Sequence, residues 1–342
     1  MRRLVGIITG AIVLACIGWS AWWYVAARSE RQGVEAWLAE QRAQGWQAEA
    51  ASIEVTGFPT DLRLTLTGLA LADPATGWAW AAPVLVAESK AWSPTTVAVD
   101  WPPEQTVSVP GERVVVGTAS MESLIDLRPG PSLELRQAAT ELTGLAVESS
   151  AGWSAAADAA SIRIAERPED LAPPNSYDVR ITADALRLPE GLVDRLDPTG
   201  WLQPRVDRVT VIGHVALADP IGLATVETGD IALRAASLRE VGFEWGEMKL
   251  VVSGAFTVDD QGYPDGQIEV EAREWRQMVR LAVGSGVIGE ETARAVTQAI
   301  EFITMLTGGG DSLSAPFNLS GGKLRIGPVA VADLPRLAPP RG

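Results

Sequence analysis

Few side chains in this sequence have the type and spacing that catalysis or metal binding requires. His214 is the only histidine among the 342 residues. A Ser-His-Asp relay can therefore form only around His214, and a zinc site there would need carboxylate ligands that no local spacing supplies. His214 lies within the run Val211–Val215, which is typical of a β-strand. We therefore interpret it as a structural or surface histidine.

A glycine pattern and an acidic turn are the other candidates for chemistry. Residues 284–289 read GSGVIG, which matches the GxGxxG string of dinucleotide-binding proteins. That string binds pyrophosphate between a strand and a helix of a βαβ unit, whereas the residues before Gly284 have a helical pattern. We interpret it as a loop between two helices. Asp259, Asp260 and Asp265 surround a glycine-rich turn but lack the ligand spacing of a calcium loop.

The cysteine count and the charge balance exclude further classes of site. Cys16 is the only cysteine, so the chain beyond it has no disulfide, no cysteine nucleophile and no cysteine metal ligands. Lys and Arg total 28 against 43 Asp and Glu, a net charge of −15. This balance argues against a nucleic-acid partner, because polyanions bind basic surfaces. We therefore expect no cofactor, no metal, no nucleic acid and no enzymatic activity.

The N-terminus carries the strongest signal in the sequence. Two arginines precede an apolar run from Leu4 to Ala27 that is interrupted only by Thr9 and Ser20. About 24 residues at about 1.5 Å each reach about 36 Å, enough to cross a hydrocarbon core of about 30 Å. Amphipathic aromatic rings favour the headgroup region. Four of them lie near the end of the run: Trp19, Trp22, Trp23 and Tyr24.

The arginines before the apolar run favour a cytoplasmic N-terminus, with the rest of the chain on the other side of the membrane. We therefore expect a single-pass protein of the bacterial inner membrane, with residues 1–28 as its anchor and its body in the periplasm. Cleavage as a signal peptide after Val25–Ala27 is one alternative. Lipidation at Cys16, where residues 13–16 loosely match a lipobox, is another.

The chain after the anchor changes from a helical to an alternating pattern. Residues 29–45 place Val34, Trp37 and Leu38 on one helical face and predict a stalk helix. Residues 62–67 then alternate between leucine and a polar residue, as in a strand with one wet face. Similar runs recur between proline- and glycine-rich turns. They are residues 84–87, 107–116, 133–135, 161–165, 177–188, 206–215, 231–238, 248–258 and 267–272.

Helical periodicity returns near the C-terminus, where residues 275–282 and 290–306 each place apolar side chains on one face. Residues 315–326 then form a hairpin pattern around Gly321-Gly322. The predicted fold class is mainly β. We expect an elongated, curved antiparallel sheet of repeated hairpins, an N-terminal transmembrane helix with its stalk helix, and two C-terminal helices packed on the sheet. Residues 46–342 are expected to form a single domain.

Two segments of the body resemble each other. Residues 66–88 read LTGLALADPATGWAWAAPVLVAE, and residues 142–166 read LTGLAVESSAGWSAAADAASIRIAE. Each gives a strand, a turn, Gly-Trp and a second strand that ends in Ala-Glu. A partial third copy contains Gly200-Trp201. The repetition favours stacked hairpin units in one extended sheet, and chance similarity in an alanine-rich sequence is the alternative.

Tryptophans beyond the apolar run have two interpretations. Each indole buries on the order of 200 Å² while keeping an N–H for a polar partner, so these rings can anchor the core at repeated turns. They can also line a hydrophobic trough that holds an acyl chain. The candidate ligand-binding residues are then Trp78, Trp80, Trp101, Trp153 and Trp201.

The body resembles a family of uncharacterised proteins. Its markers are Gly57-Phe58-Pro59, the segment LRLTLTGLALADPATGWAWAAP and the closing stretch FNLSGGKLRIGP. These are similar to the proteobacterial family called domain of unknown function 2125, from which no catalytic residues can be transferred. The segment SGAFTVDDQGYPDGQIEVEAREW resembles strand units of AsmA-like inner-membrane proteins. That resemblance implies an N-terminal anchor and a periplasmic β groove involved in lipid traffic.

These patterns favour a non-enzymatic, membrane-anchored periplasmic protein that holds a lipid or another amphiphile in an apolar β groove. The alternative is a scaffold in envelope assembly that binds a protein partner and buries the tryptophans in its core. A hydrolase is the third hypothesis, and it requires a cleft in which two carboxylates converge.

Overall fold

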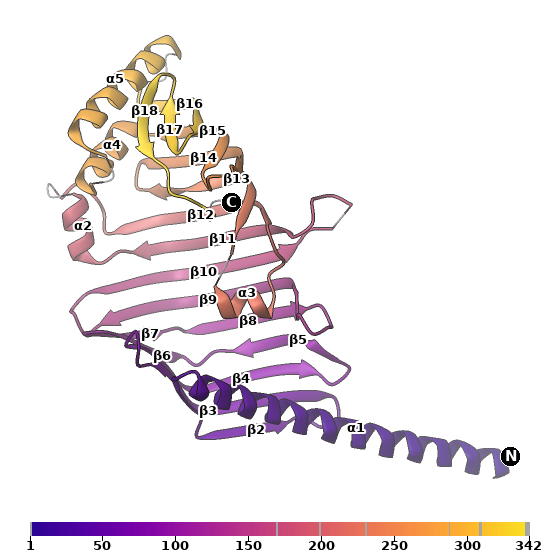
Figure 1. The fold of residues 1–342 in the computed structure, drawn as a ribbon. Helices are drawn as coiled ribbons and strands as arrows, with labels where there is room; N and C mark the ends of the chain where they lie inside the picture. The colour runs from indigo at the N-terminus through magenta and orange to yellow at the C-terminus, as the bar shows by residue number, and fades with distance from the viewer. Residues whose placement is uncertain are drawn as a thin grey trace. The chain divides into compact units, whose positions relative to one another are not determined.

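The structure, a computed structural model, describes residues 2–168, 170–197, 200–229, 231–286, 288–307 and 310–338, without the side chains of residues 2–6, 226–228, 303, 304, 306 and 307. Strands make up 53% of the chain. Over the described residues, 18 strands belong to one antiparallel sheet (Figure 1). The prediction of a mainly β fold with an N-terminal apolar helix and two helices near the C-terminus is confirmed.

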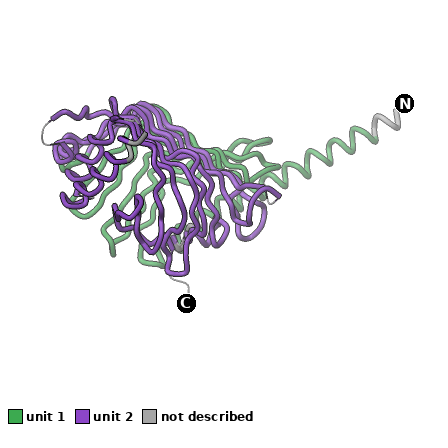
Figure 2. The backbone as a smooth tube through the Cα atoms, turned by 90° about the horizontal axis from the view of Figure 1, so that it is seen from above, with its two compact units in different colours: residues 1–126, 149–151 green, residues 127–148, 152–342 purple. Residues whose placement is uncertain are grey.

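The chain divides into two compact units. Unit 1 comprises residues 1–126 and 149–151, and unit 2 comprises residues 127–148 and 152–342 (Figure 2). The single domain predicted over residues 46–342 stays a prediction.

Unit 1 joins one long helix to a series of short hairpins. Its elements are α1 (Arg2–Ala43), β1 (Gln47–Glu49), β2 (Ser52–Thr56), β3 (Asp61–Asp73), β4 (Trp78–Lys90), β5 (Ser93–Asp100), β6 (Glu104–Val109), β7 (Glu112–Gly117) and β8 (Ser120–Leu127). The predicted anchor and stalk are one continuous helix, α1. The C-terminal part of α1 packs on the first strands through an apolar cluster of Leu38, Ala48, Leu64, Leu66 and Leu69. The leucine alternation of β3 therefore faces the stalk helix.

Unit 2 is an antiparallel meander interrupted by helices. Its elements are β9 (Leu135–Ser149), β10 (Ser154–Glu166), β11 (Ser176–Arg187), α2 (Glu190–Leu196), β12 (Arg205–Leu217), α3 (Leu223–Thr228), β13 (Leu233–Trp245), β14 (Met248–Val258), β15 (Pro264–Arg273), α4 (Trp275–Gly284), α5 (Glu290–Thr307), β16 (Ser312–Ser320), β17 (Lys323–Ile326) and β18 (Val329–Asp333). Each strand from β9 to β17 pairs with the strand that follows it. The strand traces of unit 2 arch together in Figure 2.

The two similar sequence segments form two similar hairpins, β3–β4 and β9–β10. Gly68 and Gly144 occupy the same place in the two copies and have φ of 60° and 59°. Both are skipped in the register of their ladders. The register is the same on both sides of each glycine, so the pairing is interrupted at one position without a bulge. The two hairpins therefore share this irregularity as well as their sequence.

One predicted strand is wrong in its bounds. Residues 133–135 alternate like a strand, but Leu133 has a positive φ of 44°, and β9 begins only at Leu135. The Arg128 N–H donates to the Glu134 carbonyl at 2.7 Å, which closes a loop at this point. A three-residue alternation is too short to distinguish such a loop from a strand.

Irregular pairing and a close backbone contact accompany the arching of the strands in unit 2. The register shifts between Ile212 and Gly213 on β12 and again between Leu238 and Val241 on β13. A Cβ on Gly242 would lie 1.8 Å from the Leu250 carbonyl oxygen on β14. Bulges and glycines bend a sheet where they occur, and this contact leaves no room for any side chain at position 242.

The Gly242→Ala variant should lower the free energy of unfolding by about 2 kcal/mol, because the added methyl must push β13 and β14 apart. Gly191→Ala is the matched control, since a Cβ at Gly191 in α2 meets nothing within 4 Å. Urea unfolding of the full-length protein in mild detergent, followed by circular dichroism, measures both. Equal stability of the two variants would contradict the close contact.

Candidate functional site

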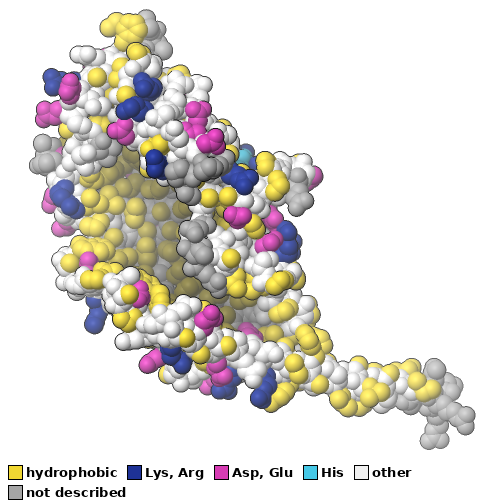
Figure 3. All heavy atoms as spheres, in the orientation of Figure 1, with side chains coloured by type: hydrophobic (Ala, Val, Ile, Leu, Met, Phe, Trp, Pro, Cys, Tyr) yellow, Lys and Arg dark blue, Asp and Glu magenta, His cyan; other side chains and the backbone are white. Residues whose placement is uncertain are grey.

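A cavity of about 730 Å³ lies within unit 2, between one face of the sheet and the helices that cover it. Strands β12 to β18 and helices α2, α4 and α5 supply its walls. Among the lining residues, which all belong to the described chain, only Thr210 and Ser285 carry a side-chain hydroxyl, and none is charged. Hydrophobic side chains also gather in a hollow over strands of unit 2 in Figure 3. The cavity is therefore suited to hydrocarbon.

The strand wall of the cavity follows from the alternation of side chains along each strand, in which every second residue points to the same face. Val252 on β14 lies opposite Val241 on β13 and Val270 on β15. Two residues earlier, Leu250 lies opposite Phe243 and Ala272 in the same way, and all six residues line the cavity. Alternate residues of a strand point to one face, so the cross-strand register produces a continuous apolar wall.

Two tryptophans of the wall have their polar atom satisfied by the backbone. The Trp245 indole N–H donates to the Gln203 carbonyl at 2.7 Å, and that of Trp275 donates to the Gly310 carbonyl at 3.2 Å. Trp275 is 2% exposed, and the Arg276 guanidinium lies 4.4 Å from its ring centroid. Because both N–H groups have partners, these rings offer only carbon surface to a ligand.

The opposite face of the same strands is charged. A pocket of about 460 Å³ there contains the ion pairs Arg208–Asp184 and Lys249–Glu244, whose nitrogen–oxygen distances are 2.8 and 2.7 Å. The hydrogen bond to Asp184 raises the pKa of Arg208. Each of these two carboxylates is held by a cation, which favours a solvated ion-pair surface over the acid–base pair that a hydrolase needs.

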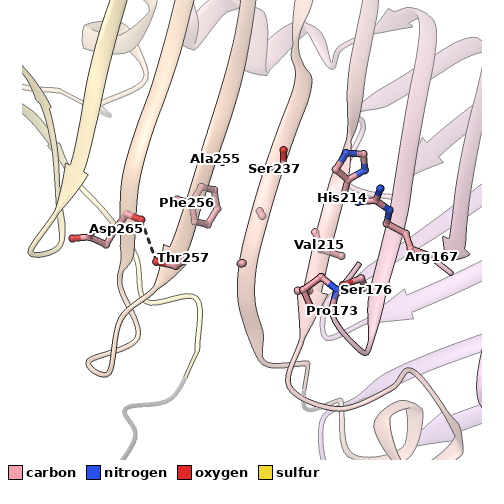
Figure 4. A pocket seen from close by; sticks show the side chains of 13 residues that line it. Arg167, Pro173, Ser176, His214, Val215, Ser237, Ala255, Phe256, Thr257 and Asp265 are labelled. Atoms are coloured by element: carbon pink, nitrogen blue, oxygen red, sulfur yellow. Dashed lines mark hydrogen bonds between the residues drawn. The ribbon is translucent and has the colours of Figure 1, made fainter. Parts of the chain in front are cut away.

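His214 lies on β12 beside a smaller pocket of about 380 Å³. Its side chain lies close to that of Arg167 in Figure 4. The His214 Nδ1 is 2.7 Å from Oδ1 of Asp178, and the Arg167 Nε is 3.4 Å from the same oxygen. The His214 side chain is 39% exposed. This agrees with the interpretation of His214 as a surface residue, here in an ion-pair cluster.

The glycine pattern at residues 284–289 lies between two helices, as expected. Gly284 ends α4 and Glu290 begins α5, while Val287 lies outside the described residues. No strand precedes the pattern, so the βαβ setting of a dinucleotide site is missing. Within the part of the chain that the structure describes, no group of three or more His, Cys, Asp or Glu residues could hold a metal ion.

Three of the five predicted ligand-binding tryptophans lie in unit 1. Trp78 and Trp80 are on β4, and Trp101 directly follows β5. The rings of Trp80 and Trp101 meet edge to face with centroids 6.4 Å apart. Their N–H groups donate to Gln105 at 3.1 Å and to Ser123 at 2.8 Å. The structure thus brings these two rings together, whereas Trp78 packs on Trp46 at 5.8 Å.

The other two predicted tryptophans, Trp153 and Trp201, lie in unit 2 and are each 36% exposed. The guanidinium of Arg280 lies 5.3 Å from the Trp201 ring centroid. None of the five lines the 730 Å³ cavity, whose tryptophans are Trp245 and Trp275. A ligand-binding role for the five stays a prediction. Of the two cavity tryptophans that were not chosen from the sequence, Trp275 begins the predicted helical segment 275–282, whereas Trp245 lies between the predicted strands 231–238 and 248–258.

Of three comparisons with known proteins, one gives a match. No curated protein and no solved structure matches this chain. A family model described as "Uncharacterized protein conserved in bacteria (DUF2125)" matches residues 23–335. That match includes the Gly57-Phe58-Pro59 marker and the closing hairpin, and the similarity to AsmA-like proteins stays a prediction. The chain therefore belongs to this family of uncharacterised bacterial proteins.

Proposed function

We propose that this chain is a non-enzymatic envelope protein, anchored in the inner membrane by α1, that binds a hydrocarbon chain in the cavity of unit 2. The body lies in the periplasm, and the ligand is a lipid or another amphiphile. The observation that carries this proposal is the 730 Å³ cavity and its uncharged lining.

The size of the cavity supports a ligand rather than ordinary core packing. The cavity is open to solvent on one side, so it is a groove on the apolar face of the sheet and a ligand can enter it. Ligand pockets usually enclose about 300 to 1,000 Å³, and a volume of about 730 Å³ falls within that range. Water would find only the hydroxyls of Thr210 and Ser285 as side-chain partners in this cavity.

The chemistry of the lining indicates which part of an amphiphile is bound. A lining without charge offers no cation to a phosphate or carboxylate, so the tail enters and the headgroup stays outside. Burying one methylene contributes about 0.8 kcal/mol, whereas association costs about 4 to 15 kcal/mol. About 5 to 19 buried methylenes are therefore needed to offset this cost, which favours long-chain lipids over short ones.

The N-terminal helix supports the proposed location. Residues Ile7–Ala43 of α1 have a mean hydropathy of 1.5 in their most apolar window, and none of that window is buried. The arginines at positions 2 and 3 favour a cytoplasmic N-terminus. A body held at a membrane has lipid available at high local concentration.

A scaffold that binds a protein partner is the second candidate, and exposed apolar side chains on α5 favour it. Phe302 is 64% exposed and Met305 is 79% exposed. Apolar side chains of this size usually mark an interaction site when they are grouped. A scaffold requires a stoichiometric partner that crosslinks to residue 302 in native membranes, and it requires no lipid in the cavity.

Affinity should rise with the length of the hydrocarbon chain. Full-length protein held in amphipol is loaded with a fluorescent fatty acid, which saturated fatty acids of 8 to 16 carbons then displace. Each added methylene should lower Kd about fourfold until the cavity is full, because about 0.8 kcal/mol is gained per methylene. Absence of displacement at every length, with no lipid in organic extracts of the purified protein, would contradict tail binding.

Filling the cavity should abolish this binding. Val252→Trp with Val270→Trp places two indoles on facing residues of the wall, and displacement should weaken at least tenfold. The matched control is Val251→Trp with Glu271→Trp, an adjacent cross-strand pair on the opposite face, which should bind as the unmodified protein does. Thermal unfolding checks that both variants fold.

If the double tryptophan variant at positions 252 and 270 does not fold, Val252→Thr with Val270→Thr is the second test. It introduces two hydroxyls at nearly constant volume, and it should also weaken binding about tenfold. Equal binding by the inward and outward variants would place the ligand elsewhere.

A further inference from the structure

The last two turns of the apolar run in α1 lie against the body of unit 1. The Trp19 indole N–H donates to the Pro59 carbonyl and that of Trp23 to the Asp61 carbonyl, each at 2.8 Å. The Trp23 ring also meets the Phe58 ring edge to face, with centroids 5.4 Å apart. Ala27 is buried with Leu62 and Ala91. The turn between β2 and β3 is therefore fixed to the helix at residues 19–27.

The part of the helix that is free of the body is too short to cross a membrane alone. Residues 7–18 are exposed on all sides, and α1 extends past the ends of β2 and β3 in Figure 1. From Leu4 to Gly18 there are about 15 residues, or about 22 Å of helix, against a hydrocarbon core of about 30 Å. The missing 8 Å or so corresponds to about five more residues and ends near Trp23. Any tilt of the helix increases this shortfall.

Two turns of unit 1 reach the same level of the helix and expose large aromatic rings there. We call them the rim: residues 57–60, between β2 and β3, and residues 90–92, from the last residue of β4 to the residue before β5. The Ala91 N–H donates to the Thr60 carbonyl at 2.9 Å, which joins the two turns. Phe58 is 55% exposed and Trp92 is 62% exposed. Exposed aromatic rings at this depth match the aromatic belt of membrane proteins.

Most backbone carbonyl groups of the first rim turn and of Asp61, which follows it, accept hydrogen bonds from the protein. The carbonyl of Gly57 accepts from the Asp61 N–H at 2.9 Å, and that of Thr60 accepts from Ala91. The carbonyls of Pro59 and Asp61 accept from the two indoles of α1. Four of the five carbonyls from residue 57 to residue 61 thus have protein donors. A turn that enters a region poor in water needs such partners. Lys90, paired with Asp61, places a cation where lipid phosphates lie.

We propose that the rim is a lipid-contact surface that lies in the headgroup layer of the membrane crossed by α1, with Phe58 and Trp92 inserted toward the hydrocarbon. The occupant of this surface is the bilayer itself, because the rim continues the surface of a helix too short to span the bilayer without it. This inference rests on the proposed anchoring by α1, and it is independent of ligand binding in unit 2. The rim fixes unit 1 close to the lipid surface.

Depth-dependent quenching tests this placement in the full-length chain. Single cysteines replace Phe58, Trp92 or Val109 in a Cys16→Ser background, and the unmodified chain supplies a cysteine at position 16. Each is labelled with an environment-sensitive nitrobenzoxadiazole and reconstituted into phosphatidylcholine vesicles that contain lipid with a nitroxide at carbon 5 or carbon 12. Val109 is 39% exposed and lies near the Trp78 end of β4, about 40 Å along that strand from Lys90.

Labels at positions 58 and 92 should emit at shorter wavelength than the label at 109. The carbon-5 nitroxide should also quench them at least twofold more strongly than it quenches 109. If the label at position 16 is quenched and the labels at positions 58 and 92 are not, the proposal for the rim is overturned, but the proposed anchoring by α1 stands. No quenching at any position would overturn both. A blue shift at 58 and 92 without quenching would mean that protein covers the rim, and it would also overturn the proposal. If the Phe58→Cys variant does not fold, the label at position 92 in Trp92→Cys decides the test. Fatty-acid displacement measures ligand binding in unit 2 independently of these labels.

Discussion

The exclusion of water from one face of strands β12 to β16 is the constraint on which unit 2 depends. Five strands about 4.8 Å apart present an apolar surface about 24 Å wide. The described chain covers this surface mainly with α4 and α5, of 10 and 18 residues. A helix is about 10 Å across with its side chains, and α4 is only about 15 Å long. These helices therefore leave part of the apolar face uncovered, and the result is the 730 Å³ cavity, which is open to solvent on one side.

Hydrogen-bonded indoles fix the elements of both units in the same way. Each presents carbon surface to an apolar cluster or cavity and directs its N–H to a fixed acceptor, so a large ring is buried without leaving an unpaired donor. In unit 1, Trp19 and Trp23 join α1 to the β2–β3 turn. In unit 2, Trp245 and Trp275 define walls of the cavity. These tryptophans therefore serve first to fix helices and turns to the sheet. Only Trp245 and Trp275 also provide apolar surface to the cavity.

Much of the fold could be predicted because it depends on local periodicity. The leucine alternation at residues 62–67 and the helical spacing after residues 275 and 290 gave the right element types. The repeated segment also gave the two hairpins that carry Gly68 and Gly144. A short alternation such as residues 133–135 failed, because a backbone hydrogen bond between Arg128 and Glu134, six residues apart, closes a loop there.

The cavity could not be predicted, because a vacancy depends on the distance between elements far apart in sequence. In the sequence, Val252 has the pattern of a buried strand residue and Met278 has the pattern of a buried helix residue. Only the folded chain shows that both border empty space. The five tryptophans chosen from sequence follow the repeated turns instead. Trp80 and Trp101 meet edge to face in unit 1, whereas the elements that form the cavity belong to unit 2.

The most direct measurement is a crystal structure of the full-length protein after equilibration with a fatty acid brominated near its methyl end. Anomalous scattering locates bromine without assumptions about the ligand. Tail binding predicts a bromine peak inside unit 2, bordered by Val252, Met278 and Ile300. A structure in which α4 and α5 close onto the sheet, with no bromine between them, would contradict the account.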